Sequence, residues 1–513
     1  MVDNPTKIYN DYVRANLPNS MSYDTGTDRY DINSHSFFKF KNSNWYFNYI
    51  SKYGYSALSA YAVNNFEPAL VFDFKGNYFR KSATASTFGA SITHAATTNA
   101  TMVDSDGLLK WRPHNLFTNS NDFTASSWTT NATITPNAAV SPDGTSNASL
   151  FPFSSSGYFQ ASLSRTVGQT YTVSAWVKSY DGTDEAFQLY GENGGFSQNF
   201  VATSEWQRFS FTYTATSTAG GYGDGIGRPT TNIPANLYVY GMQLNRSNLG
   251  GMVNNPDAST GLESYVPTTT SAVYLSRRGH HVYNGSAWVN EGILHESEAR
   301  TNFVTSSGDL TGAGWTGGAT IGTAIAGSPF GTYQTLSPSA SGHLGHAQRY
   351  QIGKPLTAGA TYVGLALVKY SVGSGWFDIN MYDTGDTNKR AYFDVQNGVV
   401  GIKDAANIDH GMIDYGDGWW LCWASANAVS GSGGPSYEAP NGNNSTSCSA
   451  ADVILIAGTQ FELGSTPSSY IPTTTTASVT RAAETLTVPA TNLPYNSTNM
   501  SIQMDGKMTY ADT

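Results

Sequence analysis

Aromatic residues beside predicted turns are the first candidates for chemistry in this chain. An exposed ring can stack on the C–H face of a sugar, while nearby amides and charged groups bond the hydroxyls. The chain has 11 Trp, and the aromatic residues best placed for such a role are Tyr190, Trp206, Trp376, Trp419 and Trp420. Neighbouring side chains of a strand point to opposite faces, so only one of Trp419 and Trp420 can face the core. The alternative for every one of these rings is packing in a core or at a sheet edge.

Two acidic turns are candidates for metal binding. They lie in the segments SYDGTDEAF and MYDTGDTNKR, and their acidic residues are Asp181, Asp184 and Glu185 in the first and Asp383 and Asp386 in the second. Carboxylate oxygens are the ligands that Ca²⁺ prefers, so each turn is a candidate for a structural calcium site. A solvated turn is the alternative, and no other cofactor is expected.

Catalytic signatures are missing from the sequence. It has no G-x-S-x-G elbow, no G-x-x-x-x-G-K-[ST] loop and no C-x-x-C pair. The string HESEA at His295 has Ala299 where a zinc-protease helix carries its second histidine. The run GGYGDGIGRP is interpreted as a flexible loop. We therefore predict a non-enzyme without catalytic residues, although the spacing of carboxylates in space is invisible at this stage.

A tandem duplication supplies the elements that must position these residues. The segment from Leu108 to Trp128 corresponds to the segment from Ile293 to Trp315, with Asn115 matching Asn302 at a constant offset of 187. Each copy is followed by a strand-like run that closes on lysine, YTVSAWVK and YVGLALVK, and each ends in a related string, SYVPTTT and SYIPTTT. Short alternating strands separated by Gly- and Asn-rich turns predict an all-β chain of tandem antiparallel sandwiches of the jelly-roll, carbohydrate-binding-module-like type.

The chain is accordingly divided into six parts. They are an N-terminal particle-attachment region (1–69), a β arm (70–107), a sandwich named module 1 (108–272), a connector hairpin (273–292), a sandwich named module 2 (293–482) and the start of a further β domain (483–513). Residues 1–69 are rich in Tyr, Asn and Phe, and they suit either an interface buried against other chains or a subdomain packed on module 1. Because the alternation near Met500 stops without partners, we expect the polypeptide to continue past Thr513.

Composition excludes several partners. A net charge of −10 and a pI near 5.3 disfavour nucleic acid, which requires a basic face. No apolar run is long enough to cross a membrane, and no secretory signal opens the chain. Cys422 and Cys448 are the two cysteines, and both a disulfide and two isolated thiols stay open, with thiols favoured by a reducing cytoplasm.

Several motifs together resemble a known family. The strings VDSDGLLKW, GILHESEARTNFV, GDGWWLCW and SYIPTTTTASVTRAAE are similar to those of bacteriophage tail-fibre, tail-spike and head-spike proteins that carry carbohydrate-binding jelly rolls. The resemblance covers about residues 70–513 and implies a virion appendage that projects toward host surface glycans during adsorption. It also implies a homotrimer. Residues 1–69 lie outside the resemblance, and the expectation that they attach the chain to other virion proteins rests on their composition.

Two alternatives to a tail fibre or spike stay open. One is a polysaccharide depolymerase whose catalytic domain lies beyond Thr513. The other is a head-spike or decoration protein with a purely structural role. A catalytic role requires a cleft with close carboxylates, a binding role requires an exposed aromatic platform, and a structural role requires neither.

Overall fold

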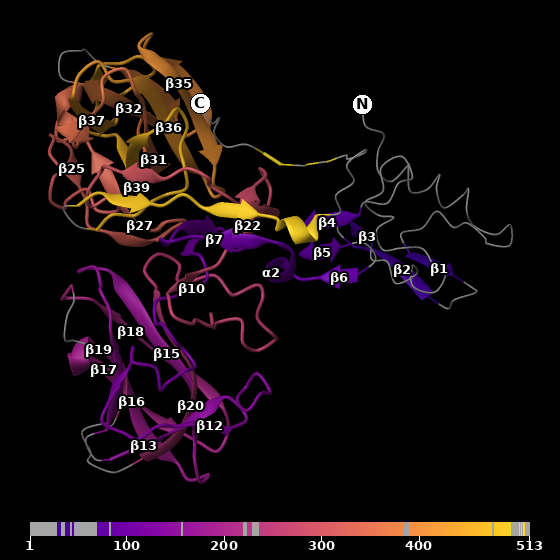
Figure 1. Ribbon diagram of the computed structural model, residues 1–513. Coiled ribbons are helices and arrows are strands. Elements are labelled where there is room, and N and C mark those ends of the chain that lie inside the picture. Colours follow the sequence, from indigo (N-terminus) through magenta and orange to yellow (C-terminus); the bar gives the residue numbers. More distant parts are fainter. Residues whose placement is uncertain are drawn as a thin grey trace. The chain divides into compact units, whose positions relative to one another are not determined.

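The computed structural model describes most of the chain from residue 69 onward. The described residues are 28–31, 36–41, 44–45, 69–81, 84–154, 157–218, 223–227, 235–383, 389–474, 477–493, 502, 504 and 506–507. They are almost entirely β, and every ladder between named strands is antiparallel, which confirms the predicted fold class. Figure 1 shows the two sandwiches as groups of magenta and orange strands.

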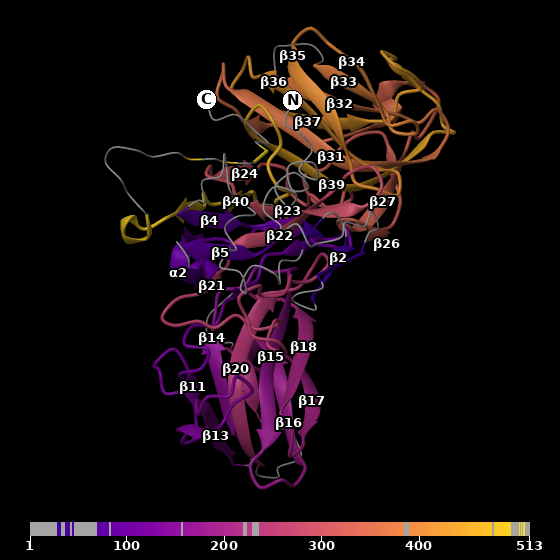
Figure 2. The same cartoon turned by 90° about the vertical axis from the view of Figure 1, so that its right-hand side faces the viewer.

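Module 1 is a sandwich of two five-stranded sheets. The first sheet has the order β11 (Thr129–Thr130), β14 (Tyr158–Ser162), β19 (Gly223–Gly227), β16 (Glu185–Gly191) and β17 (Phe196–Ala202). The second has the order β12 (Thr135–Ala139), β13 (Ala148–Phe153), β20 (Ala235–Arg246), β15 (Thr170–Ser179) and β18 (Gln207–Thr214). Several of these strands lie side by side in Figure 2. A short 3-10 helix, Glu192–Gly194, follows β16.

Module 2 repeats this strand order with one strand added at the edge of each sheet. One sheet runs β29 (Gln348–Tyr350), β37 (Ser432–Glu438), β32 (Trp376–Asp383), β33 (Arg390–Asp394) and β34 (Val399–Lys403), with β30 (Lys354–Pro355) also paired to β37. The other runs β25 (Thr320–Ile321), β27 (Gly331–Ser337), β39 (Val453–Leu463), β31 (Thr361–Val372), β36 (Trp419–Asn427) and β35 (Asn407–Asp414), with β26 (Ile325–Ser328) paired to β27. The edge strands β34 and β35, which lie in different sheets, have no counterpart in module 1.

Matched hydrogen bonds hold the start of each module to its end. The amide of Asn115 donates to the carbonyls of Met242 and Val266. In the same way, the amide of Asn302 donates to the carbonyls of Thr459 and Ile471. Trp128 and Trp315 are both buried and donate through Nε1 to the carbonyls of Asn119 and Ser306. The sequence duplication is therefore a duplication of structure, and these matched tryptophans serve packing.

The remaining strands of the larger of two compact units form two-stranded ladders outside the main sheets. They are β7 (Thr93–Ala95) with β41 (Thr485–Thr487), β8 (Thr101–Val103) with β9 (Leu109–Trp111), β10 (His114–Asn115) with β21 (Val273–Tyr274), β22 (Arg277–Tyr283) with β23 (Trp288–Leu294), β24 (Arg300–Asn302) with β40 (Val479–Arg481) and β28 (Gly342–His343) with β38 (Ser447–Cys448). A 3-10 helix, Leu344–His346, follows β28. The expected connector hairpin is β22–β23, with Asn284 bonding the turn through Ser286 and Ala287.

Buried, ion-paired side chains lie in and beside these short strands. Arg277 pairs with both Glu296 and Glu484, Arg112 pairs with Glu484, and Arg481 pairs with Glu296. All five side chains are buried. Because an unpaired buried charge is costly, these ion pairs must form together, and they fix the connector relative to the end of module 2.

A second, smaller unit contains β4 (Leu70–Asp73), β5 (Tyr78–Lys81), β6 (Thr84–Ser86), the helix α2 (Phe88–Ser91) and the 3-10 helix Ala490–Asn492. Within it, Lys81 donates to the carbonyl of Thr491. Backbone strands β1 (Asp28–Asp31), β2 (Ser36–Lys41) and β3 (Asn44–Trp45) form a separate ladder. The predicted attachment role of 1–69, the start of a further domain at 483–513 and the remaining boundaries stay predictions, since both regions lie largely outside the described residues.

The glycine-rich run corrects the sequence interpretation. It contains β19, a central strand of the first sheet of module 1 and not a flexible loop. A Cβ atom on Gly223 would strike the side chain of Gln160, and one on Gly227 would crowd the ring of Tyr190. Strand β19 has glycines on this face because side chains of the neighbouring strands cover it. A propensity scale does not include such contacts between strands.

Candidate functional site

One face of the second sheet of module 1 gathers rings and cations. The apolar residues of β15 and β20, such as Val177 and Val239, point into the core, so the alternating residues point outward. We name the outward group the aromatic–cationic face; its members are Trp176, Lys178, Tyr180, Trp206, Arg208 and Tyr238. All are half-buried except Tyr180, which is 50% exposed.

Lys178 is the centre of this face. Its Nζ lies 5.6 Å from the ring centroid of Trp206 and 5.7 Å from that of Tyr238, within cation–π range of both. The ring of Tyr180 lies 5.4 Å from that of Tyr238. Trp206 donates through Nε1 to the carbonyl of Val140 at 3.0 Å, which fixes the orientation of its indole. The three rings and the ammonium thus form a row along one end of the sheet.

A second cation continues the face. The guanidinium of Arg208 lies 5.8 Å from the ring centroid of Trp176 and 5.6 Å from that of Tyr265. It donates to Ser174 Oγ at 2.8 Å and to the carbonyl of Gly241. Burial lowers the pKa of Arg208 to about 10, so the group stays charged at neutral pH. Its donors are partly used inside the module, and its position is fixed.

Asp143, whose carboxylate lies beside this face, is fully hydrogen-bonded to its own neighbours. Asp143 accepts hydrogen bonds from Tyr240, Ser141, Thr145 and Asn147. Burial alone would raise the pKa of Asp143, but these bonds outweigh it and lower the pKa below its usual range. Asp143 is ionised at neutral pH, and its role is to hold the loop and the Tyr240 ring.

The equivalent face of module 2 is covered. Trp419 follows a turn as Trp206 does, and it pairs across the sheet with Lys369, whose Nζ lies 5.9 Å from its ring centroid. Here the chain itself packs over the face, and Trp419 lies in a buried cluster with Val103 and Leu109, against which Trp288 packs. Only 2% of Trp419 is exposed. The expectation that Trp419 presents a ring to a sugar is therefore corrected, because both sides of its indole are occupied.

The other aromatic candidates lie away from the face that contains Trp206. Trp420 is half-buried, packs on the core of module 2 and lies against Gly398. Trp376 is half-buried at the start of β32. Tyr190 is 4% exposed and donates to Gln160 Oε1 at 3.2 Å, so its ring is part of the sheet surface and not a free platform. Trp206 is the one of the five that the structure places in an exposed group of rings.

The acidic turns serve the fold in visible ways. Asp181 accepts from the backbone and hydroxyl of Thr183, which closes the turn and lowers the pKa of Asp181. Asp184 is exposed, and Glu185 begins β16. Among the described residues no three His, Cys, Asp or Glu side chains are grouped so that they could hold a metal ion. Calcium at this turn stays a prediction.

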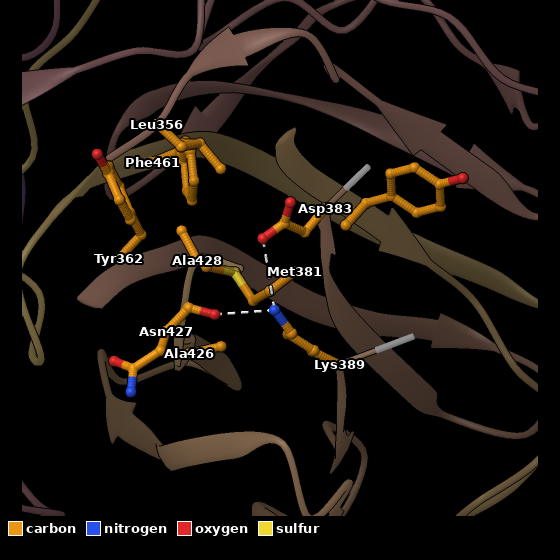
Figure 3. Close-up of a pocket in the computed structure, with 10 residues that line it drawn as sticks. Leu356, Tyr362, Met381, Asp383, Lys389, Ala426, Asn427, Ala428 and Phe461 are labelled. Carbon is orange, nitrogen blue, oxygen red and sulfur yellow. Dashed lines mark hydrogen bonds and ion pairs between the residues drawn. The ribbon is translucent and has the colours of Figure 1, made fainter. Parts of the chain in front are cut away.

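Asp383 lines a small pocket at one end of module 2 (Figure 3). Its carboxylate accepts from the backbone of Val429 and from Ser430, and it lies 3.6 Å from Lys389 Nζ. Lys389 in turn donates to the carbonyl of Asn427 at 2.8 Å, as the dashed lines in Figure 3 mark. The oxygens of Asp383 are thus engaged in tying β32 to the chain after β36. Asp386, the second expected ligand, lies outside the described residues.

A buried carboxylate pair was invisible in the sequence. Asp378 and Glu438 face each other across β32 and β37, and Arg390 bonds both. Neither carboxylate is exposed. Burial and the charge of Glu438 raise the pKa of Asp378 well above its usual range. The arrangement is a buried ion triad, which a substrate cannot reach.

The two cysteines are separate buried thiols. Cys422 lies in the core of module 2, where burial raises its pKa well above the usual value. Cys448 lies within 3.4 Å of the carbonyl oxygens of Ala340 and His343. Of the two states left open by the sequence, the structure has the unpaired one.

Comparison with known proteins does not identify a family for this chain. No family model and no curated protein matches the chain. The tandem CBM22-1–CBM22-2 domain of Paenibacillus barcinonensis Xyn10C is similar over 72% of this chain and 99% of its own, at 12% identity and a TM-score of 0.24. The single CBM22-1 xylan-binding domain of the same protein is similar over 30% and 97%, at 14% identity and a TM-score of 0.20.

A phage structure is among the similar ones. The enzymatically active domain of bacteriophage CBA120 tailspike protein 4 is similar over 26% of this chain and 21% of its own length, at 12% identity and a TM-score of 0.20. At such identities and TM-scores, no functional argument is drawn from these likenesses.

No helix in the described part of the chain is long and apolar enough to span a membrane.

Most of the aromatic–cationic face is not evident from the sequence. There, Lys178 is only the residue that closes a repeated strand, and no local pattern marks Tyr238 or Arg208. A usable signal existed, because Lys178 matches Lys369 in the repeat and Trp206 matches Trp419. A tryptophan and a lysine that recur together on neighbouring strands indicate a pair in contact.

Proposed function

We propose that this chain is a carbohydrate-binding structural protein whose module 1 binds a surface glycan through the aromatic–cationic face. The observation that carries the proposal is that this face stays half-exposed in module 1, where Trp176 and Trp206 pack in part against Tyr240 and Tyr265, whereas the chain buries the equivalent face of module 2. Grouped aromatic rings left at a surface are characteristic of binding sites.

The chemistry of the face suits a sugar. The rings of Trp206, Tyr238 and Tyr180 offer apolar surfaces for C–H groups, and their polar tips stay in contact with water. The ammonium of Lys178 can donate to ring oxygens or acidic groups. Since a row of rings along a sheet matches successive units of an extended chain, a polysaccharide fits better than a single small molecule.

We further infer a biological setting, namely the virion of a bacteriophage, in which the chain is a tail fibre or spike. The motifs that resemble phage appendage proteins support this inference, and glycan binding is what adsorption to a host surface requires. In this proposal, residues 1–69 contact other virion proteins and three copies assemble about one axis. The protein is made in the host cytoplasm and carried on the particle.

A binding role is favoured over catalysis within the described residues by a specific observation. The carboxylates of Asp378 and Glu438 are close enough to share Arg390, but both are buried and bonded to it. Glycoside hydrolysis requires two carboxyl groups on either side of an accessible bond. Any depolymerase activity would therefore need other residues.

An array of immobilised bacterial surface polysaccharides tests the proposal. The full-length chain is expected to bind at least one, and Trp206→Ala and Tyr238→Ala are expected to weaken binding tenfold or more. Tyr382→Ala is the matched control, because Tyr382 is 41% exposed on module 2. Near-ultraviolet circular dichroism verifies that each variant is folded. Binding that is unchanged in both module 1 variants would contradict the proposal.

A further inference from the structure

Module 2 shows what accompanies a paired lysine and tryptophan on this sheet. Lys369 lies over Trp419, and its Nζ donates to Asp417 Oδ2 at 2.9 Å. Asp417 stands two residues before Trp419 in the turn that leads into β36. The group is thus a triad of a ring, a cation on the ring and a carboxylate that neutralises the cation.

Module 1 has two members of this triad and lacks the third. Lys178 lies over Trp206, but the position two residues before Trp206 is Ser204. Glu205 is the nearest acidic residue in sequence, and it is exposed and forms no ion pair with Lys178. In the described part of the chain, Lys178 has no carboxylate within ion-pair distance.

The surroundings of Lys178 favour a carboxylate from a ligand over water as its partner. Its ammonium lies between two rings, where part of its hydration is replaced by ring faces, and charge-assisted bonds gain strength as water is removed. Arg208 adds a second positive charge to the same face, and the carboxylate of Asp143 is bonded to four neighbours of its own. Lys178 and Arg208 are therefore the two cations of this face, while the exposed carboxylates of Glu205 and Asp181 stand next to Trp206 and Tyr180 in the sequence.

We propose that the glycan bound by this face is acidic and that a carboxylate on one of its sugars pairs with Lys178, as Asp417 pairs with Lys369. The inference rests on the proposed function and names its substrate class. The ring of the same sugar lies against Trp206 or Tyr238, so that stacking and ion pairing act on one residue of the polysaccharide. A carboxylate is chosen over a phosphate because a carboxylate is what the equivalent lysine binds within this chain.

Binding of four acidic polymers tests the inference, namely polygalacturonate, alginate, hyaluronate and polysialic acid. Each is compared with its own carboxyl-reduced, neutral form, and a glycerol teichoic acid represents phosphate. The full-length chain is expected to bind at least one acidic polymer at least tenfold more tightly than the reduced form. Lys178→Gln is expected to abolish that difference, while Lys369→Gln is expected to leave it intact.

A gain-of-charge variant makes the test sharper. Ser204→Asp places a carboxylate where module 2 has Asp417, and it is expected to fill the position beside Lys178 and weaken acidic binding about tenfold. Ser204→Asn, of the same size, is the control and should bind as the parent does. Because Ser204 is exposed, neither variant disturbs the core.

The outcomes separate the inference from the proposed function. One outcome is that acidic and reduced polymers bind equally, and that Trp206→Ala weakens binding whereas Lys178→Gln does not. This outcome would overturn the acidic class of the glycan and leave glycan binding itself intact. Preference for teichoic acid over all four carboxylated polymers would also overturn it. Failure of every acidic polymer to bind would overturn it as well, whereas array binding insensitive to Trp206→Ala would contradict the proposed function itself.

Discussion

Trp206 and Trp419 occupy the same position in two copies of one fold but differ in burial, because Trp206 is half-buried and Trp419 is fully buried. Both follow a turn, both lie under a lysine of the neighbouring strand, and both point away from their sandwich core. In module 2 the chain packs strands β8 and β9 on that face, and the lysine is neutralised by Asp417. In module 1 the face stays half-exposed. Duplication therefore produced one face that is buried within the chain and one that keeps contact with solvent.

The largest difference expected between the two positions is in stability. Trp419→Ala leaves a cavity in a buried cluster and should cost about 3–5 kcal/mol, whereas Trp206→Ala at a half-exposed position should cost about 1–2 kcal/mol. Differential scanning calorimetry of the full-length chain measures both as shifts of transition midpoint. Equal shifts would mean that Trp206 is as structural as Trp419.

A matched position in the long strands β20 and β39 predicts a pH effect that arises in module 2. Burial raises the pKa of Glu462 to about 7, and module 1 has Asn245 at the equivalent place in its strand. The folded-state pKa lies above the unfolded one, so the stabilising contribution is complete below about pH 4.5 and is lost as the pH rises through about 7. The loss amounts to about 3 kcal/mol.

Glu462→Gln tests this pH effect. The variant should melt higher than the parent at pH 8 and nearly equal to it at pH 4.5, in calorimetric scans at both values. Asn245→Gln in module 1 is the control and should show no such pH dependence. If the difference in melting temperature between the parent and Glu462→Gln is the same at pH 4.5 and pH 8, the pKa of Glu462 is not raised by folding.

Binding should depend on one module alone. Tyr238→Ala removes one of the two rings beside Lys178 and should weaken glycan binding by about 1.5 kcal/mol, or roughly tenfold. Leu455→Ala, at the matched position of module 2, is the corresponding change and should leave binding unaltered in surface plasmon resonance with the polysaccharide that binds best on the array. Comparable losses in the two variants would place the glycan site elsewhere.

The smallest effect is expected at Asp417. Its pair with Lys369 is largely exposed, since the Asp417 side chain is 87% accessible, and such pairs contribute about 0–1 kcal/mol. Asp417→Asn should therefore change the melting temperature little and should not create glycan binding in module 2, because Trp419 stays covered. New binding in this variant would show that charge alone, without an open ring, defines the site.

The sequence was sufficient for the fold because the modules have regular local patterns. The strand-like run YTVSAWVK predicted β15 to within about one residue at each end, since one face of the strand is apolar and the other is not. The glycine strand β19 escaped prediction because its outward positions are filled by side chains of other strands, which local propensity cannot represent.

The site was harder to predict for a related reason. Whether Trp206 or Trp419 is exposed is decided by β8 and β9, which pack on one copy of the face and not on the other. That choice is made by contacts between residues some 300 positions apart in the chain, such as those of Leu109 with the cluster around Trp419. Similarity between the two copies of the repeat predicts the pair of tryptophan and lysine, but not which copy is covered.

A crystal structure of the full-length chain with an oligosaccharide from the polysaccharide that binds best tests the central claim most directly. The account predicts a sugar ring against Trp206 or Tyr238, with a carboxylate of the ligand within hydrogen-bond distance of Lys178 Nζ. A ligand seated instead on the opposite sheet of module 1, over Gln160 and Tyr190, or on module 2 with the Trp206 face empty, would contradict it.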